Sequence, residues 1–267
     1  MADASSPVPP RPAEPVPARP AATVLLVRDG AAGLEVFMVV RHREIEFAGG
    51  ALVFPGGRVE EADAALAGDD PLGAFRIAGI RETFEECGVL LAREPGAAEM
   101  IRRDRLLEVA DRYHAALLRN ARSLPEVLAA ERLEPATDAM AHWAHWVTPA
   151  SRSKRFDTQF FLAAAPPDQL AVHDGLESVE SVWIAPAQAV AEADAGKRRL
   201  VFATRKNLEK LARHATVADA LAACRAATTV VRVQPEMVRS GGGWRIRIPA
   251  EADYGGDSFD TLDAPAI

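Results

Sequence analysis

The chain has 267 residues, of which 49% are hydrophobic, so it is long enough to bury one sizeable core, and its formal net charge is −7. We expect neither a nucleic-acid partner, which depends on clustered lysine and arginine, nor a membrane partner, because no apolar run approaches the roughly twenty residues that cross a bilayer. The two cysteines are too few for a disulfide framework and favour a reducing, cytoplasmic setting.

The N-terminal part divides into a tail and a predicted hairpin. Residues 1–21 are dominated by proline and alanine and have almost nothing to bury, which predicts a disordered tail. Residues 22–27 and 34–40 are apolar, β-branched runs on either side of Asp29-Gly30, which predicts two strands joined by a turn. A loop at Gly56-Gly57 then follows a strand end, and backbone carbonyls in such a loop can approach a metal without side-chain obstruction.

The best-defined element is a helix predicted from about residue 74 to residue 87. Four apolar residues recur at helical spacing and should pack against the core: Ile77, Ile80, Phe84 and Cys87. Gly88 follows directly and can adopt the left-handed conformation that ends helices. The turn-rich stretch before the helix, residues 68–73, should loop outward and leave the helix intact.

The same helix carries an acidic face. Glu82, Glu85 and Glu86 stand at positions i, i+3 and i+4, so they project from one side although like charges repel. Clustered carboxylate oxygens suit hard cations such as Mg²⁺ or Mn²⁺. Arg81 lies four residues before Glu85, a spacing that allows an ion pair to orient this carboxylate.

The second half of the chain predicts further helices and strands. Residues 98–133 have helical spacing, and Ser123-Leu124-Pro125-Glu126 is typical of a helix start. This segment either packs as an added amphipathic layer or forms a wall, lid or dimer surface. Strands are expected at 143–149 and 156–163, helices from 186 to 226, and a terminal hairpin between 228–233 and 244–248. The last of these helices should open at Thr216, since Thr216-Val217-Ala218-Asp219 has the spacing of a capping box.

Two groups of basic residues follow predicted strands. Arg41 and Arg43 come after the second strand, and Arg152, Lys154 and Arg155 lie between two later strands. Each group is either a solvated strand end or a pocket edge that meets the phosphates of an anionic substrate. We therefore treat these four arginines as candidate substrate-binding residues.

The glycine loop and the acidic helix together resemble the Nudix box. The glycine is Gly57, the acid after five residues is Asp63, and the closing half is Arg81-Glu82-Thr83-Phe84-Glu85-Glu86-Cys87-Gly88-Val89. Asp63 stands where glutamate is usual, seventeen residues separate it from Arg81 in a lengthened spacer, and Thr83 occupies a usually apolar position.

The lengthened spacer and the Phe-Pro-Gly-Gly opening are similar to one branch of this family, the peroxisomal coenzyme A and acyl-coenzyme A diphosphatases and their bacterial relatives. Later runs at 155–162 and 182–186 are similar to the same branch, and the likeness spans about residues 22 to 211.

The resemblance implies an α+β fold in which a mixed sheet lies between helices as an α/β/α sandwich. It places a Nudix hydrolase domain at residues 22–213, with a helical insertion at about 98–140 and a C-terminal helix and hairpin extension at 214–267. Homodimers occur in the resembled family, but nothing in the sequence fixes an assembly.

The resemblance also implies roles for individual residues. Metal ligands are expected to be the Gly56 carbonyl, Glu82, Glu85 and Glu86, with Glu82 as ligand or base. Arg81 would orient the acids, and Asp63 would contribute from outside the set of direct metal ligands. A further acid downstream commonly joins the metal site or serves as base in this family, which favours Glu177 and then Glu180, although both could equally be exposed loop acids.

The implied reaction is metal-dependent hydrolysis of a diphosphate bond in a phosphorylated small molecule, with coenzyme A or acyl-coenzyme A as the first candidate. One alternative is Nudix pyrophosphatase activity on NADH, dinucleotides, nucleotide sugars or modified nucleoside triphosphates. A second alternative, motivated by Asp63 and the long spacer, is a non-catalytic nucleotide-binding module.

Overall fold

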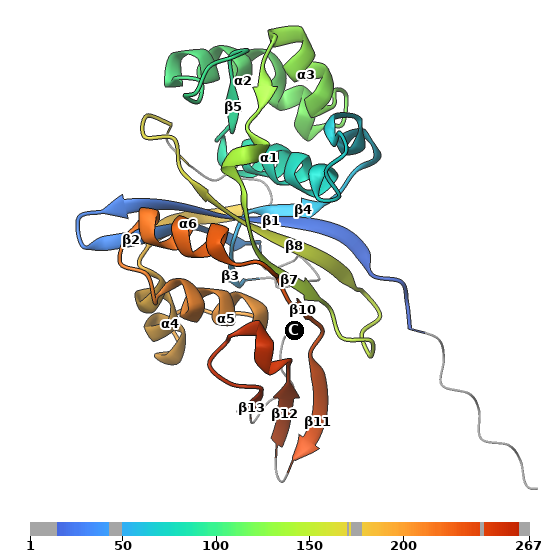
Figure 1. Cartoon of the computed structure of the whole chain (residues 1–267), viewed down its shortest axis with the longest axis vertical. Helices are drawn as coiled ribbons and strands as arrows, with labels where there is room; N and C mark the ends of the chain where they lie inside the picture. Colours follow the sequence, from blue (N-terminus) through green and yellow to red (C-terminus); the bar gives the residue numbers. More distant parts are fainter. Residues whose placement is uncertain (1–14, 43–49, 170, 172–177, 241–242, 262–267) are drawn as a thin grey trace, which may run out of the picture.

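A computed structural model describes residues 15–42, 50–169, 171, 178–240 and 243–261. Within these residues, a mixed eight-stranded sheet lies between two groups of helices, which confirms the expected sandwich (Figure 1). The long strand β1 (Arg19–Gly30) runs through its middle, parallel to β8 and antiparallel to β2 and β4. The other strands of this sheet are β2 (Gly33–Arg41), β3 (Leu52–Val53), β4 (Gly56–Arg58), β7 (Ala141–Val147), β8 (Phe156–Ala164), β9 (Ser178–Ile184) and β10 (Arg232–Val233).

The N-terminal hairpin differs from the prediction at both of its ends. β1 begins at Arg19 because residues 19–21 pair with β8 from Phe156 onward, so the sheet includes residues that we expected in the tail. The hairpin turn is Ala31-Ala32 and not Asp29-Gly30, since Gly30 is already paired with Gly33. Composition suggested a tail, but a partner strand from elsewhere in the chain determines where β1 starts.

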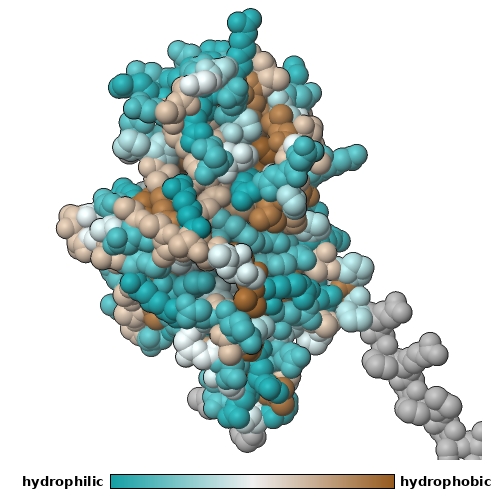
Figure 2. Space-filling model, viewed as in Figure 1, coloured by the Kyte–Doolittle hydropathy of each residue, from teal (hydrophilic) through white to brown (hydrophobic). Residues whose placement is uncertain are grey.

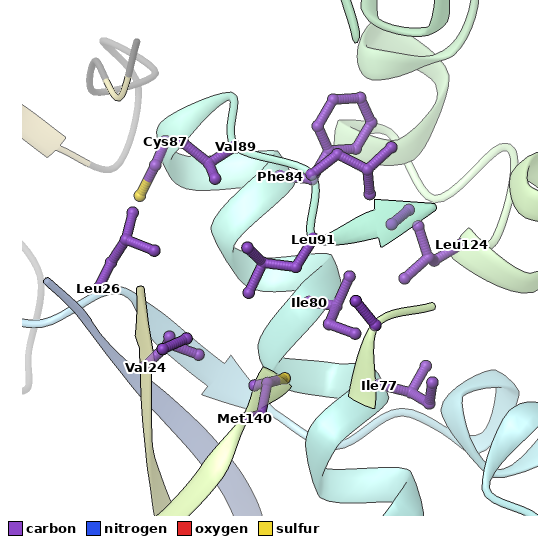
Figure 3. Packing of buried hydrophobic residues seen from close by; sticks show 14 of the residues in the cluster. Val24, Leu26, Ile77, Ile80, Phe84, Cys87, Val89, Leu91, Leu124 and Met140 are labelled. Carbon is purple, nitrogen blue, oxygen red and sulfur yellow. The ribbon is translucent and has the colours of Figure 1, made fainter. Parts of the chain in front are cut away.

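The acidic helix forms as predicted. α1 (Gly73–Cys87) buries its apolar stripe completely, and Gly88 ends it with φ of 65° and ψ of 21°. Figure 3 shows Cys87 pointing toward Leu26 of β1, whereas Ile77, Ile80 and Phe84 lie on the side of the helix where Leu124 is. All of these residues belong to one core. The stripe therefore fixes the helix on one face of the sheet and sets the direction in which its acids point.

The insertion adds a second layer over α1. It consists of α2 (Arg103–Leu118) and α3 (Leu124–Glu131), with the short strands β5 (Ala92–Arg93) and β6 (Glu134–Pro135) paired beneath them. The expected start of α3 is confirmed: Ser123 caps it, and its backbone N–H donates to Glu126 Oε2 at 2.8 Å. Leu106, Val109 and Leu117 of α2 share one core with the α1 stripe.

The opposite face of the sheet is covered by α4 (Pro186–Asp194), α5 (Phe202–Leu211) and α6 (Val217–Ala226). Leu25 and Val27 of β1 pack with these helices in a second core, because alternate residues of a strand point to opposite faces. α6 begins at the expected cap, where Thr216 Oγ1 accepts a hydrogen bond from the Asp219 N–H at 3.1 Å. Figure 2 shows the hydrophobic residues on one side of the molecule as small separate patches among hydrophilic ones.

The predicted terminal hairpin is wrong in its pairing. β12 (Gly243–Arg247) pairs with β11 (Glu236–Ser240) and β13 (Ser258–Thr261) in a separate three-stranded sheet, whereas β10 joins the main sheet beside β7. Pro235 lies between β10 and β11 and has no N–H to donate, so the two strands do not continue into one another. Short 3₁₀ helices complete the chain: η1 (Glu61–Leu66), η2 (Thr137–Ala139) and η3 (Ala250–Ala252).

Among the helices in the described ranges, none combines the length and the hydropathy needed to cross a bilayer.

Candidate active site

The short strand β4 brings the glycine loop against the acidic helix. It pairs with the first half of β1, Ala22 opposite Gly57, at a level where β2 does not reach. A Cβ atom at Gly57 would lie 2.3 Å from Glu82 Oε1. Gly56 has φ of +152°, and a Cβ atom there would lie 2.3 Å from the Ala22 carbonyl oxygen. Both glycines are therefore needed for this close approach of strand, strand and helix.

Arg81 lies at the centre of the site and is only 4% exposed. Its Nη1 atom donates to Glu82 Oε1 at 2.9 Å and to Glu85 Oε2 at 3.0 Å, so the ion pair that the spacing predicts is present. Its Nη2 atom donates to the Arg58 carbonyl oxygen at 2.7 Å. One guanidinium thus holds two acids of α1 and the backbone of β4 in a fixed relation.

Asp63 binds the other side of the same guanidinium. Its carboxylate oxygens lie 3.2 Å from Nε and 3.2 Å from Nη2 of Arg81, and the side chain is fully buried. Asp63 also accepts a hydrogen bond from the Glu60 N–H at 2.8 Å within η1. The residues between η1 and α1 loop out and return, so the lengthened spacer leaves the contact between Asp63 and Arg81 intact.

Burial and charge shift the ionisation of this group. Burial raises the pKa of Glu85, and this effect outweighs the opposing influence of Arg81. Burial alone would lower the pKa of Arg81, but Glu82, Asp63 and Glu85 together raise it above its ordinary value. The arginine is therefore a permanent positive charge among the acids.

Glu86 is held by the backbone. Its Oε2 atom accepts a hydrogen bond from the Gly56 N–H at 3.1 Å, and the residue is 8% exposed. Glu86 consequently faces the glycine loop, next to the pair formed by Glu82 and Glu85.

These groups line one cavity of about 640 Å³. Four acids line it, Glu60, Glu82, Glu85 and Glu86, together with Arg81 and three further basic residues, Arg19, Arg58 and Lys154. Aromatic side chains form another part of the wall, namely Phe54, Trp146, Phe156 and Phe160, and the insertion contributes Leu117 and Leu118. The cavity thus combines an acidic centre, positive charge and an extended apolar wall.

The chemistry of the acidic centre fits a hard divalent cation. Three carboxylates of one helix reach the same cavity, and oxygen ligands of this kind suit Mg²⁺ or Mn²⁺. No three Asp, Glu, His or Cys side chains in the described part of the chain stand as a ready-made metal cluster. Glu82 and Glu85 instead direct one oxygen each to Arg81, and Glu86 directs one to Gly56.

The structure places the other candidate residues elsewhere or does not describe them. Arg155 is buried and donates to the carbonyl oxygens of Thr148 and Val16, and neither Arg155 nor Arg152 lines the cavity. Glu180 forms an ion pair with Arg198 at 2.8 Å and does not line the cavity. The Arg41 side chain, Arg43 and Glu177 lie outside the described residues.

Three basic residues that line the cavity were not among the predicted substrate-binding residues. Arg58 directly follows Gly56-Gly57, so its closeness to the box was available as a signal. Lys154 lies within the basic run between Arg152 and Arg155, where sequence alone does not show which side chain faces the cavity. Arg19 carries no such signal, because only the pairing of β1 with β8 brings it there.

Comparisons with known proteins point to one family. A family model described as the NUDT19 Nudix domain matches residues 65–201. A protein named putative nudix hydrolase 7 from Caenorhabditis elegans is 34% identical over 165 residues, which cover 62% of this chain and 51% of that protein. The acyl-coenzyme A diphosphatase NUDT19 of Gallus gallus is 29% identical over 215 residues, which cover 60% of this chain and 56% of that protein. The chain therefore spans about half the length of these two relatives.

A solved structure shows the same fold. The crystal structure of a NUDIX hydrolase from Alicyclobacillus acidocaldarius is 26% identical and superposes with a TM-score of 0.67, covering 77% of this chain and 96% of that one. The box residues, the sandwich and the family model all lead to the same assignment: the chain belongs to the Nudix hydrolase family.

Proposed function

We propose that this Nudix hydrolase cleaves the diphosphate bond of coenzyme A or acyl-coenzyme A in a reaction that depends on Mg²⁺ or Mn²⁺. The observation that supports it is the single cavity in which the acids of α1 meet basic side chains and a long apolar wall. A substrate with a diphosphate between two organic groups needs all three features. The name of the Gallus gallus relative, acyl-coenzyme A diphosphatase, supports the same choice.

The carboxylates of Glu82, Glu85 and Glu86 would hold the cation. When bound, a divalent cation neutralises phosphate oxygens and makes water a better nucleophile. Arg81 fixes the carboxylates of Glu82 and Glu85, and Asp63 fixes Arg81 in turn. Glu82 is also our candidate base, because its carboxylate lies at the glycine loop within the cavity.

The organic parts of the substrate would meet the apolar wall. Phe156 and Trp146 line the cavity from the sheet, and Leu117 and Leu118 line it from the insertion. The former belong to strands of the main sheet and the latter to the layer above α1, so the apolar lining comes from two different layers of the fold.

A second candidate reaction keeps the mechanism and changes the substrate. NADH, dinucleotides, nucleotide sugars and modified nucleoside triphosphates all present a phosphoanhydride to the same acids. The products distinguish these reactions, because only coenzyme A species release adenosine 3′,5′-bisphosphate together with 4′-phosphopantetheine or its acyl form.

The test is product analysis by mass spectrometry after incubation with Mg²⁺ or Mn²⁺ and a panel of these compounds. We expect adenosine 3′,5′-bisphosphate from coenzyme A species, lost in Glu85→Gln and Glu86→Gln. Glu61→Gln is the matched control, because Glu61 is an exposed acid of η1 that does not line the cavity. Cleavage of another panel member alone would replace the coenzyme A proposal, and full activity of both variants would remove the acids from the mechanism.

A further inference from the structure

Three basic residues form a row across adjacent strands at the cavity. Arg58 of β4 lies beside β1 opposite Ala21, Arg19 begins β1, and β1 pairs Arg19 with Phe156 of β8, two residues after Lys154. Neighbouring strands are about 5 Å apart, and directly paired residues point to the same face of a sheet. Arg58 of β4 and Arg19 of β1, which lies two residues before Ala21, therefore share one face of the sheet, and Lys154 lines the same cavity from the residues just before β8.

The row is distinct from the acidic centre, although both line the same cavity. Arg81 donates to Glu82 and Glu85, and the Gly56 N–H donates to Glu86, and none of these three hydrogen bonds involves a side chain of the row. Arg19 and Arg58 are exposed, and no carboxylate lies within ion-pair distance of either among the residues with described positions. The backbone of β4 lies between the two groups, since the Arg58 carbonyl oxygen accepts from Arg81 while its side chain belongs to the row.

The acidic centre and the basic row suit two different kinds of phosphate group. The acidic centre suits a diphosphate that arrives with a divalent cation. A row of positive side chains suits a phosphate without a metal partner, because a phosphate monoester carries a charge of about −1.5 to −2 at neutral pH. Arginine can bind such a group through two parallel hydrogen bonds. Coenzyme A carries both kinds of group, a diphosphate and a 3′-phosphate monoester on its ribose.

We propose that Arg19, Arg58 and Lys154 bind the ribose 3′-phosphate of the substrate and make the enzyme prefer coenzyme A species to diphosphates that lack this group. The inference rests on the proposed function, because it names the part of the same substrate that the row recognises. Arg58 directly follows the glycines of the box, whereas Arg19 and Lys154 lie further from it. Substitutions of Arg19 and Lys154 therefore test the role of the row best.

The experiment compares kcat/KM for coenzyme A and for 3′-dephospho-coenzyme A, which share the scissile bond and differ in one phosphate. The variants are Arg19→Gln, Lys154→Gln and the double variant. Arg28→Gln is the matched control, because Arg28 is an exposed arginine of the same strand that does not line the cavity. We expect the wild-type preference for coenzyme A to fall roughly tenfold in each single variant, as for the loss of one charge-assisted hydrogen bond, and further in the double variant.

Equal losses for both substrates would mean that the row acts on the shared diphosphate and would overturn the inference. An unchanged preference would mean that the row is solvated surface and would also overturn it. A second measurement does not depend on cleavage: calorimetric binding of adenosine 3′,5′-bisphosphate and of adenosine 5′-monophosphate to the wild type and the double variant. If the enzyme cleaves neither coenzyme A substrate, the proposed function fails. The row is still supported in that case if the wild type binds adenosine 3′,5′-bisphosphate more tightly than adenosine 5′-monophosphate and the double variant does not. Absence of that preference would overturn the row as a 3′-phosphate site.

Discussion

Arg81 links the two separated halves of the box. It contacts Asp63 from the first half and Glu82 and Glu85 from the second, almost without exposure to solvent. Removal of a buried charge of this kind is costly mainly because of the groups that it leaves behind: Asp63 would be buried without its positively charged partner. The contact therefore matters for stability as well as for the position of the acids.

We predict that Arg81→Gln lowers the free energy of unfolding by about 3 kcal/mol. Asp63→Asn in the same chain should restore part of the loss, because it removes the carboxylate that the substitution leaves unpaired. Urea unfolding of both single variants and the double variant gives the coupling energy. Strict additivity of the two substitutions would contradict this account.

The buried carboxylate of Glu85 predicts a particular pH dependence. Because burial raises its pKa in the folded state above the ordinary value of 4.5, the folded protein holds this proton to higher pH than the unfolded chain does. The contribution of Glu85 to the free energy of unfolding is therefore largest below the pKa of the unfolded chain, and it is lost as the pH rises through the pKa of the folded state. The unfolding free energy of the wild type should therefore decline, relative to Glu85→Gln, as the pH rises above the ordinary carboxyl pKa of 4.5. A relative gain over this range would mean that Arg81 outweighs burial.

At the scale of elements, the C-terminal extension reaches the cavity through one aromatic side chain. Trp146 of β7 lines the cavity, and its Nε1 atom donates to the Tyr254 hydroxyl at 2.9 Å. That hydroxyl donates to Asn207 Oδ1 at 3.1 Å, and Asn207 is fully buried in α5. The segment after η3 thus holds part of the cavity wall in place.

Tyr254→Phe keeps the ring and removes this hydroxyl. We predict a loss of about 1 kcal/mol in unfolding free energy, with a higher KM and a smaller change in kcat, because the wall loosens while the acids stay in place. Thermal denaturation and steady-state kinetics measure the two effects. Arg245→Gln, which breaks an exposed ion pair in the same extension, is the control. A kcat loss without a KM change would place Tyr254 in a different role.

The sequence predicts local structure well where short-range rules decide it. The stripe of α1, its end at Gly88 and the caps at Ser123 and Thr216 all depend on residues a few positions apart. The start of β1 at Arg19 and the pairing of β10 with β7 depend on strands distant in the chain, and composition carries no information about them. The same limit applies to the site: spacing predicts the acidic face and the Arg81–Glu85 pair, but only the sheet register brings Arg19 into the cavity.

At the scale of the whole molecule, a ligand that binds only the folded state stabilises it according to its concentration and affinity. If the acids of α1 hold a divalent cation, millimolar Mg²⁺ or Mn²⁺ should raise the melting temperature of the wild type, and EDTA should reverse the increase. Glu82→Gln combined with Glu85→Gln and Glu86→Gln should abolish the increase, whereas Glu61→Gln should keep it. An equal increase in all variants would place the cation elsewhere.

The short strand β4 also has a consequence for how the enzyme loses activity. Its three residues line the cavity together with members of both hydrophobic cores: Leu117 from the core that holds the acidic helix, and Trp146 and Phe160 from the core on the opposite face of the sheet. The active site therefore lies between the two hydrophobic cores. We therefore expect substitutions that loosen the packing of either core to lower the turnover rate before they unfold the chain, even where the substituted residues do not contact the substrate.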